Sequence, residues 1–184
     1  MMNPHCHYIS YEQTNAFSKI VLDYLEANKH LQPFYQYEPS LSGIRKAIND
    51  RKKYSIDRKI LIQELQNQYA GYNLTALQQQ NLQALLKEST FTITTAHQPN
   101  IFTGHLYFIY KILHAIKLCD VLKKEIPDHY FVPIFYMGSE DADLDELGHI
   151  YIDDEKLAWE TNQRGAVGRM NTKGLEKIIK IGRA

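Results

Sequence analysis

The spacing of apolar residues divides the chain near residue 90. Before this point apolar positions recur at helical spacing in four stretches, each preceded by a residue that can cap a helix. The predicted helices begin at Asn15, Ser40, Asp57 and Thr75. The first is expected to reach about Asn28, after a short leader with an edge strand over residues 7–11. Residues 1–90 are therefore predicted to form a helical N-terminal segment without internal repeats.

Beyond residue 90 the chain alternates between strand and helix. A stretch rich in Phe, Thr and Ile predicts a strand over 91–96, and a polar loop then leads into a helix over 105–125. Pro127 ends this helix, and a second apolar strand follows at 129–136. A strand, a helix and a strand at this spacing predict one βαβ unit with parallel strands and a right-handed crossover.

Shorter elements are predicted after this unit. They are a helix near 143–147 and strands at 149–153 and 156–160, which we expect to add an edge to the βαβ unit. The fold class is therefore α/β, with a partial Rossmann-like parallel sheet over residues 91–184 behind the helical segment. One βαβ unit plus an edge is a small sheet, so we expect this domain to be incomplete.

Charge and composition exclude several classes of protein. Lys plus Arg and Asp plus Glu both number 21, and a net charge of zero argues against a nucleic-acid partner. No apolar run reaches the length of a membrane span, and the N-terminus lacks the basic start and apolar core of a secretory signal. The two cysteines, Cys6 and Cys119, lie far apart, which is typical of a reduced cytoplasmic protein. No metal site is predicted, because the terminal triplet His5, Cys6 and His7 lacks a fourth ligand.

Candidate chemistry lies after the two predicted strands, where ligands of doubly wound sheets bind. The first strand is followed by a polar loop that opens the long helix, and the first N–H groups of a helix favour a phosphate or another anion. The second strand is followed by an acidic run. The candidate residues are His97, Gln98, Asn100, Thr103, Gly104 and His105 after the first strand, and Ser139, Glu140, Asp141 and Asp143 after the second.

Local structure alone can account for several of these residues. His97 can end a strand, His105 can begin a helix, and Gly104 suits a turn because it has no Cβ. Asp143 with Glu146 has the spacing of a capping box, so the acidic run can simply begin a helix. Both interpretations stay open for each residue.

Three blocks of sequence resemble one known family. Residues 96–111, AHQPNIFTGHLYFIYK, are similar to the signature loop of the cysteine-adding enzymes of bacillithiol biosynthesis (BshC). Residues 132–150, VPIFYMGSEDADLDELGHI, and residues 165–170, GAVGRM, resemble the two blocks that follow this loop in the family. The departures from the family pattern are His97, His105 and Ala142, in place of Gln, Pro and His. The last departure removes an imidazole from the candidate site.

The resemblance implies a ligase that joins the carboxyl group of cysteine to the amine of glucosaminyl-malate. A carboxylate does not acylate an amine unaided, so the resemblance also implies activation, with ATP and Mg as the expected cofactors. The stretch FTGH at 102–105 is similar to the H-x-G-H motif of class I aminoacyl-tRNA synthetases and nucleotidylyltransferases, with Phe102 in place of the first His.

The roles implied by the resemblance can be assigned residue by residue. Those expected in catalysis are His97, Glu140 and Asp141. Those expected to hold the phosphates of ATP are Thr103, Gly104 and His105. Those expected to bind substrate are Gln98, Asn100, Ser139, Asp143 and Arg169. Arg169 follows Gly168 and suits a phosphate or malate carboxylate, although a surface arginine is an equal alternative.

The expected partners are the small molecules cysteine and glucosaminyl-malate, and neither nucleic acid nor membrane. A homodimer or a missing C-terminal part is expected to complete the site, so the 184-residue chain alone is expected to be inactive. Two alternatives stay open. One is a non-catalytic nucleotide- or thiol-binding remnant of the family, and the other is a nucleotidylyltransferase with another acceptor.

Overall fold

The computed structural model describes residues 7–181, and its contacts divide the chain into two compact units, 1–56 and 57–184. The boundary predicted near residue 90 separates two kinds of sequence pattern, and it stays a prediction. His5 and Cys6 of the terminal triplet lie outside the described residues.

The first unit contains helices α1 (Lys19–Leu25) and α2 (Leu41–Arg51) and two 3₁₀ turns, Glu12–Thr14 and Gln32–Phe34. Ser40 caps α2 as predicted, because its hydroxyl accepts a hydrogen bond from the Gly43 N–H at 3.1 Å. The prediction that Asn15 begins the first helix is wrong, because Asn15 is left-handed and ends a 3₁₀ turn. The strand predicted over 7–11 is also wrong, since these residues form no strand.

The second unit begins with helices α3 (Arg58–Gln68) and α4 (Ala76–Ala84). The Asp57 carboxylate accepts hydrogen bonds from two first-turn N–H groups of α3. Thr75 and Gln78 form a reciprocal capping box at the start of α4. Both predicted helix starts are therefore confirmed, because a cap needs only residues that are neighbours in sequence.

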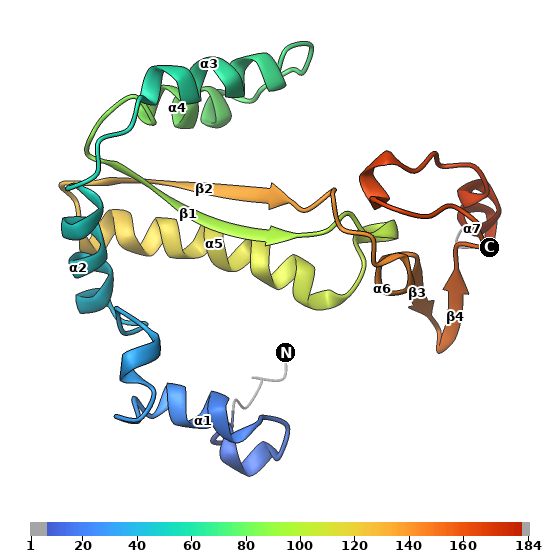
Figure 1. Cartoon of the computed structure of the whole chain (residues 1–184), viewed down its shortest axis with the longest axis horizontal. Coiled ribbons are helices and arrows are strands. Elements are labelled where there is room, and N and C mark those ends of the chain that lie inside the picture. Colours follow the sequence, from blue (N-terminus) through green and yellow to red (C-terminus); the bar gives the residue numbers. More distant parts are fainter. Residues whose placement is uncertain (1–6, 182–184) are drawn as a thin grey trace, which may run out of the picture. The chain divides into compact units, whose positions relative to one another are not determined.

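A βαβ unit follows, as predicted. Its elements are β1 (Thr90–His97), α5 (Leu106–Glu125) and β2 (Tyr130–Met137), and the two strands are adjacent and parallel (Figure 1). The register pairs the first residues of the two strands with each other and the last residues with each other, so both strands end at the same edge. The predicted α/β fold class, with helices ahead of a small parallel sheet, is confirmed.

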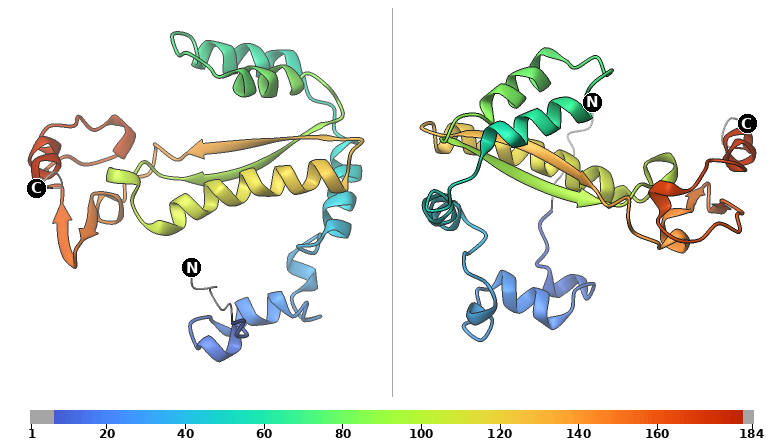
Figure 2. Two further views of the ribbon diagram at one scale, coloured as in Figure 1. Left: turned by 180° about the vertical axis from the view of Figure 1, so that it is seen from behind. Right: turned by 45° about the horizontal axis from the view of Figure 1, so that its top comes forward.

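The β1–β2 sheet lies between two layers of helix. Helix α5 covers one face and the α3–α4 pair lies over the other, and Figure 2 shows the same layers from behind. Leu122, Cys119 and Phe131 are almost completely buried. Cys119 is therefore a core residue, and its burial raises the pKa of its thiol to about 11. The cluster under α3 and α4 consists of Ile62, Ala84, Leu85 and Val132.

The remaining elements are α6 (Leu144–Leu147), β3 (His149–Ile152), β4 (Glu155–Ala158), the 3₁₀ turn Val167–Arg169, and α7 (Leu175–Ile181). Strands β3 and β4 pair with each other in an antiparallel hairpin, so the prediction that they add an edge to the βαβ sheet is wrong. The physical reason lies in the turn between them. Asp153 and Asp154 have φ of 49° and 66°, as a two-residue hairpin turn of type I′ requires.

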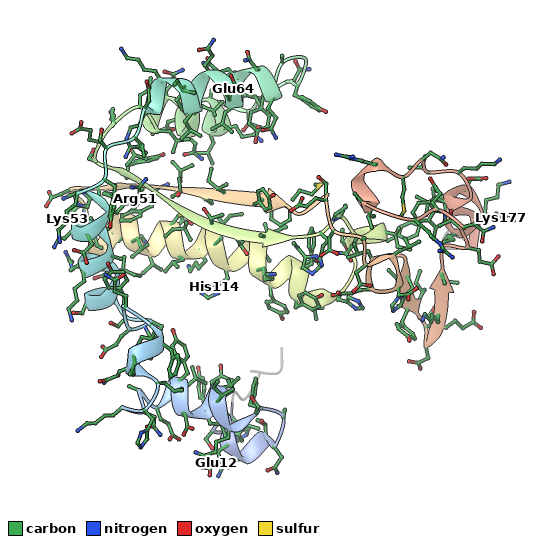
Figure 3. All side chains as sticks on the ribbon, viewed as in Figure 1. Glu12, Arg51, Lys53, Glu64, His114 and Lys177 are labelled. Atoms are coloured by element: carbon green, nitrogen blue, oxygen red, sulfur yellow. The ribbon has the colours of Figure 1, made fainter. Side chains whose placement is uncertain are left out.

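The longest helix, α5, has 20 residues and a mixed outer surface. His114 is exposed and projects from α5 on the side away from the strands (Figure 3). Among residues 7–181, no helix is both long enough and apolar enough to cross a membrane.

Candidate functional site

The candidate site begins where β1 and β2 end side by side. His97 is opposite Met137 in the register, and the Gly138 N–H donates to the His97 carbonyl at 3.0 Å. Strand pairing therefore continues one step beyond the strands before the two loops separate. The loop from β1 to α5 and the loop from β2 to α6 leave the sheet at the same edge, as sequence analysis predicted.

The loop from β1 to α5 has an unusual backbone. Phe102, Thr103 and Gly104 have φ of 48°, 71° and 61° in succession. A Cβ at Gly104 would lie 2.6 Å from the Cβ of Asn100, so only glycine fits there. The Gly104 N–H is already used within the loop, where it donates to the Ile101 carbonyl at 2.8 Å. Left-handed backbone at residues other than glycine is costly, and it often marks functional loops.

His97 is the only imidazole among the described residues that is buried, at 7 % exposed. The Nδ2 of Asn100 lies 2.9 Å from its Nδ1, and the Oη of Tyr107 lies 2.9 Å from its Nε2. The rings of Tyr107 and Phe108 contact its ring. Both nitrogens therefore have protein partners, and the imidazole is held in one orientation.

One hydrogen bond joins the two loops directly. The Gln98 Nε2 donates to Oδ2 of Asp141 at 2.9 Å, across 43 residues of sequence. The other carboxylate oxygen of Asp141 accepts the Asp143 N–H at 3.0 Å. These bonds, that from Gln98 first, hold the pKa of Asp141 below its usual range. Asp141 is therefore a carboxylate at neutral pH, anchored beside the β1–α5 loop.

The other two carboxylates of the acidic loop, Glu140 and Asp143, each have a different kind of partner. The Glu140 carboxylate accepts from the Tyr136 hydroxyl at 3.1 Å, which raises the pKa of Tyr136. The Asp143 carboxylate accepts the Glu146 N–H at 3.1 Å, so it caps α6. Asp143 is therefore confirmed as a cap, but the reciprocal half of the predicted capping box is wrong, because the Asp143 N–H donates to Asp141 and not to Glu146. The predicted contact of Asp143 with substrate stays a prediction.

The 3₁₀ turn Val167–Arg169 lies against the acidic loop. The Val167 N–H donates to the Asp141 carbonyl and the Gly168 N–H donates to the Ser139 carbonyl, both at 2.8 Å. A Cβ at Gly168 would lie 2.4 Å from the Cβ of Ser139, so the close approach requires glycine. Arg169 is thereby brought to the site, although among the described residues its side chain forms no ion pair.

The structure brings most of the predicted residues together. Six candidates form hydrogen bonds with one another or with the 3₁₀ turn Val167–Arg169. They are His97, Gln98, Asn100, Ser139, Asp141 and Asp143. The His105 ring stacks on Tyr107, with the ring centres 5.6 Å apart. Thr103 and Glu140 lie on the same two loops, where the Glu140 carboxylate accepts from Tyr136. The roles assigned to these residues stay predictions.

Sequence reasoning missed Tyr107, Glu146 and His149. The Tyr107 hydroxyl donates to Oε1 of Glu146 at 2.9 Å, and partial burial together with this carboxylate raises the pKa of Tyr107. The His149 ring meets the His105 ring edge-on at 5.7 Å, which places β3 against the β1–α5 loop. A phenol hydroxyl in the first turn of the predicted helix, directly after the candidate loop, was the available signal for Tyr107.

The family model described as the N-terminal Rossmann-like domain of bacillithiol biosynthesis BshC matches residues 4–182. The chain belongs to the BshC family. The match covers both strands and both loops of the candidate site, which therefore lies within the Rossmann-like domain of the family.

Relatives named "Putative cysteine ligase BshC" extend this result. The chain is 42 % identical over 179 residues to that of Flavobacterium psychrophilum, covering 96 % of this chain and 34 % of the relative. It is 43 % identical over 171 residues to that of Cytophaga hutchinsonii, covering 93 % and 33 %. It is 30 % identical over 142 residues to that of Bacillus thuringiensis, covering 74 % and 25 %. The chain thus spans about a third of the length of the first two relatives.

Helix α5 of this BshC domain begins beside the candidate site, and its Phe108 N–H donates to the His105 carbonyl at 3.0 Å. His105 is the N-cap of α5 but makes no capping hydrogen bond with its side chain, so the first N–H groups of the helix are not capped by it. A phosphate would fit these N–H groups. Among the described residues, no three His, Cys, Asp or Glu side chains gather in a way that could hold a metal ion.

A cavity of about 370 Å³ lies at the opposite end of the sheet, near the start of β2. Its lining residues are Gln80, Gln83, Ala84, Lys87, Ser89, Pro127, Asp128, His129 and Tyr130. None of the candidate residues lines it, and its position at the amino ends of the strands is not where doubly wound sheets bind ligands.

Proposed function

We propose that this chain forms the N-terminal part of a cysteine ligase that joins the carboxyl group of cysteine to the amine of glucosaminyl-malate. Membership of the BshC family and the names of the relatives support the ligase class. The observation that carries the proposal is the Gln98–Asp141 hydrogen bond, which joins the two loops where a doubly wound sheet binds its ligands.

Amide formation needs an activated carboxyl group and a neutral amine. ATP with Mg²⁺ would supply the activation when bound, and the first-turn N–H groups of α5 beside Thr103, Gly104 and His105 would hold its phosphates. The acidic loop would serve the other reactant. Glu140 and Asp141 would attract the substrate ammonium group, and one of them would accept its proton.

The remaining candidates position the substrates. Gln98 and Asn100 offer amide groups at the end of β1, and Ser139 offers a hydroxyl at the end of β2. Arg169 lies on the turn that contacts this loop and suits a malate carboxylate through its planar guanidinium. Catalysis would then consist mainly of positioning and charge stabilisation.

The test uses the chain alone and the chain joined to the part of the Flavobacterium psychrophilum relative that lies beyond the match. Purified proteins receive cysteine, glucosaminyl-malate, ATP and Mg²⁺, and mass spectrometry detects the amide product. We expect product from the joined protein and none from the chain alone. If the joined protein binds ATP but makes no amide, the nucleotide-binding alternative replaces the ligase.

Substitutions in the joined protein assign the roles. His97→Ala and Glu140→Gln should each lower turnover by on the order of 10²-fold, the usual contribution of a general acid or base. Cys119→Ala, in the core, and Glu64→Gln, labelled on α3 in Figure 3, should have little effect on turnover. Unchanged turnover in His97→Ala would remove His97 from the catalytic set.

A further inference from the structure

Tyr107 occupies a junction between three elements. Its hydroxyl oxygen lies 2.9 Å from Nε2 of His97 on β1 and 2.9 Å from Oε1 of Glu146 on α6, while Tyr107 itself is in the first turn of α5. We propose that Tyr107 is a positioning residue that holds His97 as the neutral tautomer with its proton on Nε2. The tautomer follows from geometry alone, and only its use in catalysis rests on the proposed function.

The direction of each hydrogen bond follows from the Glu146 carboxylate, which is the last acceptor in the row of bonds from Asn100 through His97 and Tyr107. A carboxylate only accepts, so the Tyr107 O–H must donate to Glu146. The phenol oxygen is then left with lone pairs, and it must accept a proton from Nε2 of His97. A neutral imidazole carries one proton, so Nδ1 is bare and accepts from the Asn100 Nδ2 at 2.9 Å.

The other neutral tautomer fits this network poorly. A proton on Nδ1 could be donated to the Gln98 carbonyl at 3.1 Å, but it would also face the N–H₂ group of Asn100, donor against donor at 2.9 Å. Nε2 would then need a donor, and the Tyr107 O–H would have to leave Glu146 to provide one. All three hydrogen bonds would be lost or reversed in a partly buried network, where unmade bonds are costly.

Asn100 gives this arrangement a second state. Its Oδ1 is buried and has no hydrogen-bond partner among the described residues, while its Nδ2 serves both Nδ1 of His97 and the Gln98 carbonyl. If Nδ1 gained a proton, a half-turn of the Asn100 amide would present Oδ1 as its acceptor. The Gln98 carbonyl, 3.1 Å from Nδ1, is a second acceptor for the same proton.

His97 can therefore take up a proton at Nδ1, and its proton on Nε2 stays bonded to Tyr107 in both states. Tyr107 connects the resulting positive charge to the Glu146 carboxylate. The other ionisable groups around this network are Asp141, bonded to Gln98; His105, stacked on Tyr107; and Lys111, whose Nζ lies 5.9 Å from the centre of the Tyr107 ring.

The test is nuclear magnetic resonance of the 184-residue chain labelled with ¹⁵N at histidine. Long-range proton–nitrogen spectra distinguish the two tautomers of each imidazole. We expect His97 to carry its proton on Nε2 in the unmodified chain. Tyr107→Phe removes the oxygen that accepts this proton, so His97 should become a mixture of tautomers. Tyr110→Phe is the matched control, since Tyr110 lies about one turn further along α5 and is 64 % exposed. It should leave the His97 tautomer unchanged.

Two variants of Glu146 test the position of the His97 proton from the other side of Tyr107. Glu146→Ala frees the Tyr107 O–H to donate to Nε2, which should move the His97 proton to Nδ1. Glu146→Gln keeps an oxygen that can accept from Tyr107 and should retain the Nε2 proton. His129 and His149 report folding in the same spectra. A proton on Nδ1 in the unmodified chain, or an unchanged His97 in both folded Tyr107→Phe and Glu146→Ala, would overturn the proposal.

The catalytic consequence is measured in the joined protein described above. Tyr107→Phe should lower kcat by on the order of 10²-fold and leave KM nearly unchanged, because His97 would be held in the wrong tautomer part of the time. Tyr110→Phe should leave both constants unchanged. If the joined protein makes no amide at all, the proposed function fails while the tautomer result stands, so the two failures are distinguishable.

Discussion

The two ends of the β1–β2 sheet are built differently. At the amino end Thr90 and Phe131 are each 1 % exposed, beneath the turn that follows α4. At the carboxyl end Tyr136 and Met137 are more than half exposed, and the buried side chain there is the imidazole of His97. The amino end, where the first strand residues are buried beside the cavity, is called the closed end, and the carboxyl end, where the last residues of β2 are exposed, is called the open end. We therefore expect substitutions at the closed end to lower the free energy of unfolding most, while the candidate site residues lie at the open end.

Polar groups show the same contrast. At the amino end the Arg58 guanidinium donates to the carbonyls of Leu85 at 2.8 Å and Thr90 at 3.1 Å, and the Thr90 hydroxyl donates to the Ala84 carbonyl at 2.6 Å. At the carboxyl end Asn100 keeps an unpartnered oxygen, next to three residues with left-handed backbone. Costly features of this kind are typical of sites whose geometry serves something other than stability.

The largest expected effect is at the closed end. Phe131→Ala removes an almost completely buried ring from the amino end of the sheet, so the free energy of unfolding should fall by about 3–5 kcal/mol. Denaturant unfolding followed by circular dichroism measures it. Phe34→Ala is the control, because this ring is 84 % exposed and its loss should have almost no effect. Equal effects of the two changes would contradict the contrast between the ends.

The next effect also concerns the closed end. Arg58→Ala leaves the Leu85 and Thr90 carbonyls without a charged donor, which should lower the free energy of unfolding by about 2–3 kcal/mol. Lys59→Ala removes a neighbouring exposed cation and should cost much less. A similar loss in both variants would show that charge at the start of α3, and not the two hydrogen bonds, is what matters.

A smaller effect is expected at the open end. Gly168→Ala would bring a Cβ within 2.4 Å of Ser139, so the turn must move away from the acidic loop. We expect a loss of about 1–2 kcal/mol and faster exchange of the Gly168 amide hydrogen. Gly138→Ala is the matched control, because its Cβ would meet nothing closer than 3.9 Å. Identical exchange in the two variants would show that the close approach does not hold the turn.

The smallest effect depends on pH. Hydrogen bonds keep the pKa of Asp141 below its usual range, so they favour the folded state at neutral pH, and this contribution is lost as the pH falls below about 4. Gln98→Ala removes the largest cause and should raise the pKa of Asp141, measured from its carboxyl ¹³C shift during titration. Gln66→Ala, exposed on α3, should leave this pKa unchanged. An unchanged pKa of Asp141 in Gln98→Ala would show that the Gln98–Asp141 hydrogen bond does not join the two loops in solution.

Local patterns predicted part of the site correctly. Loop residues at the ends of β1 and β2 were expected to meet because parallel strands end at one edge, and Gln98 and Asp141 do meet. The contact between Tyr107 and Glu146 spans 39 residues and depends on where α6 packs, so no pattern of spacing contained it. Strands β3 and β4 were predicted as strands but assigned to the wrong sheet, because the tight turn at Asp153 and Asp154, which pairs them with each other, was not recognised.

By itself the sequence determined the elements whose energies are local: the caps at Ser40, Asp57 and Thr75, and the strand, helix and strand of the βαβ unit. These depend on hydrogen bonds between near neighbours and on the spacing of apolar residues. Only the tertiary structure decided which polar groups became partners. The tautomer inferred for His97 is the clearest case, since a ring with two nitrogens takes its state from groups on β1, α5 and α6 that meet only after folding.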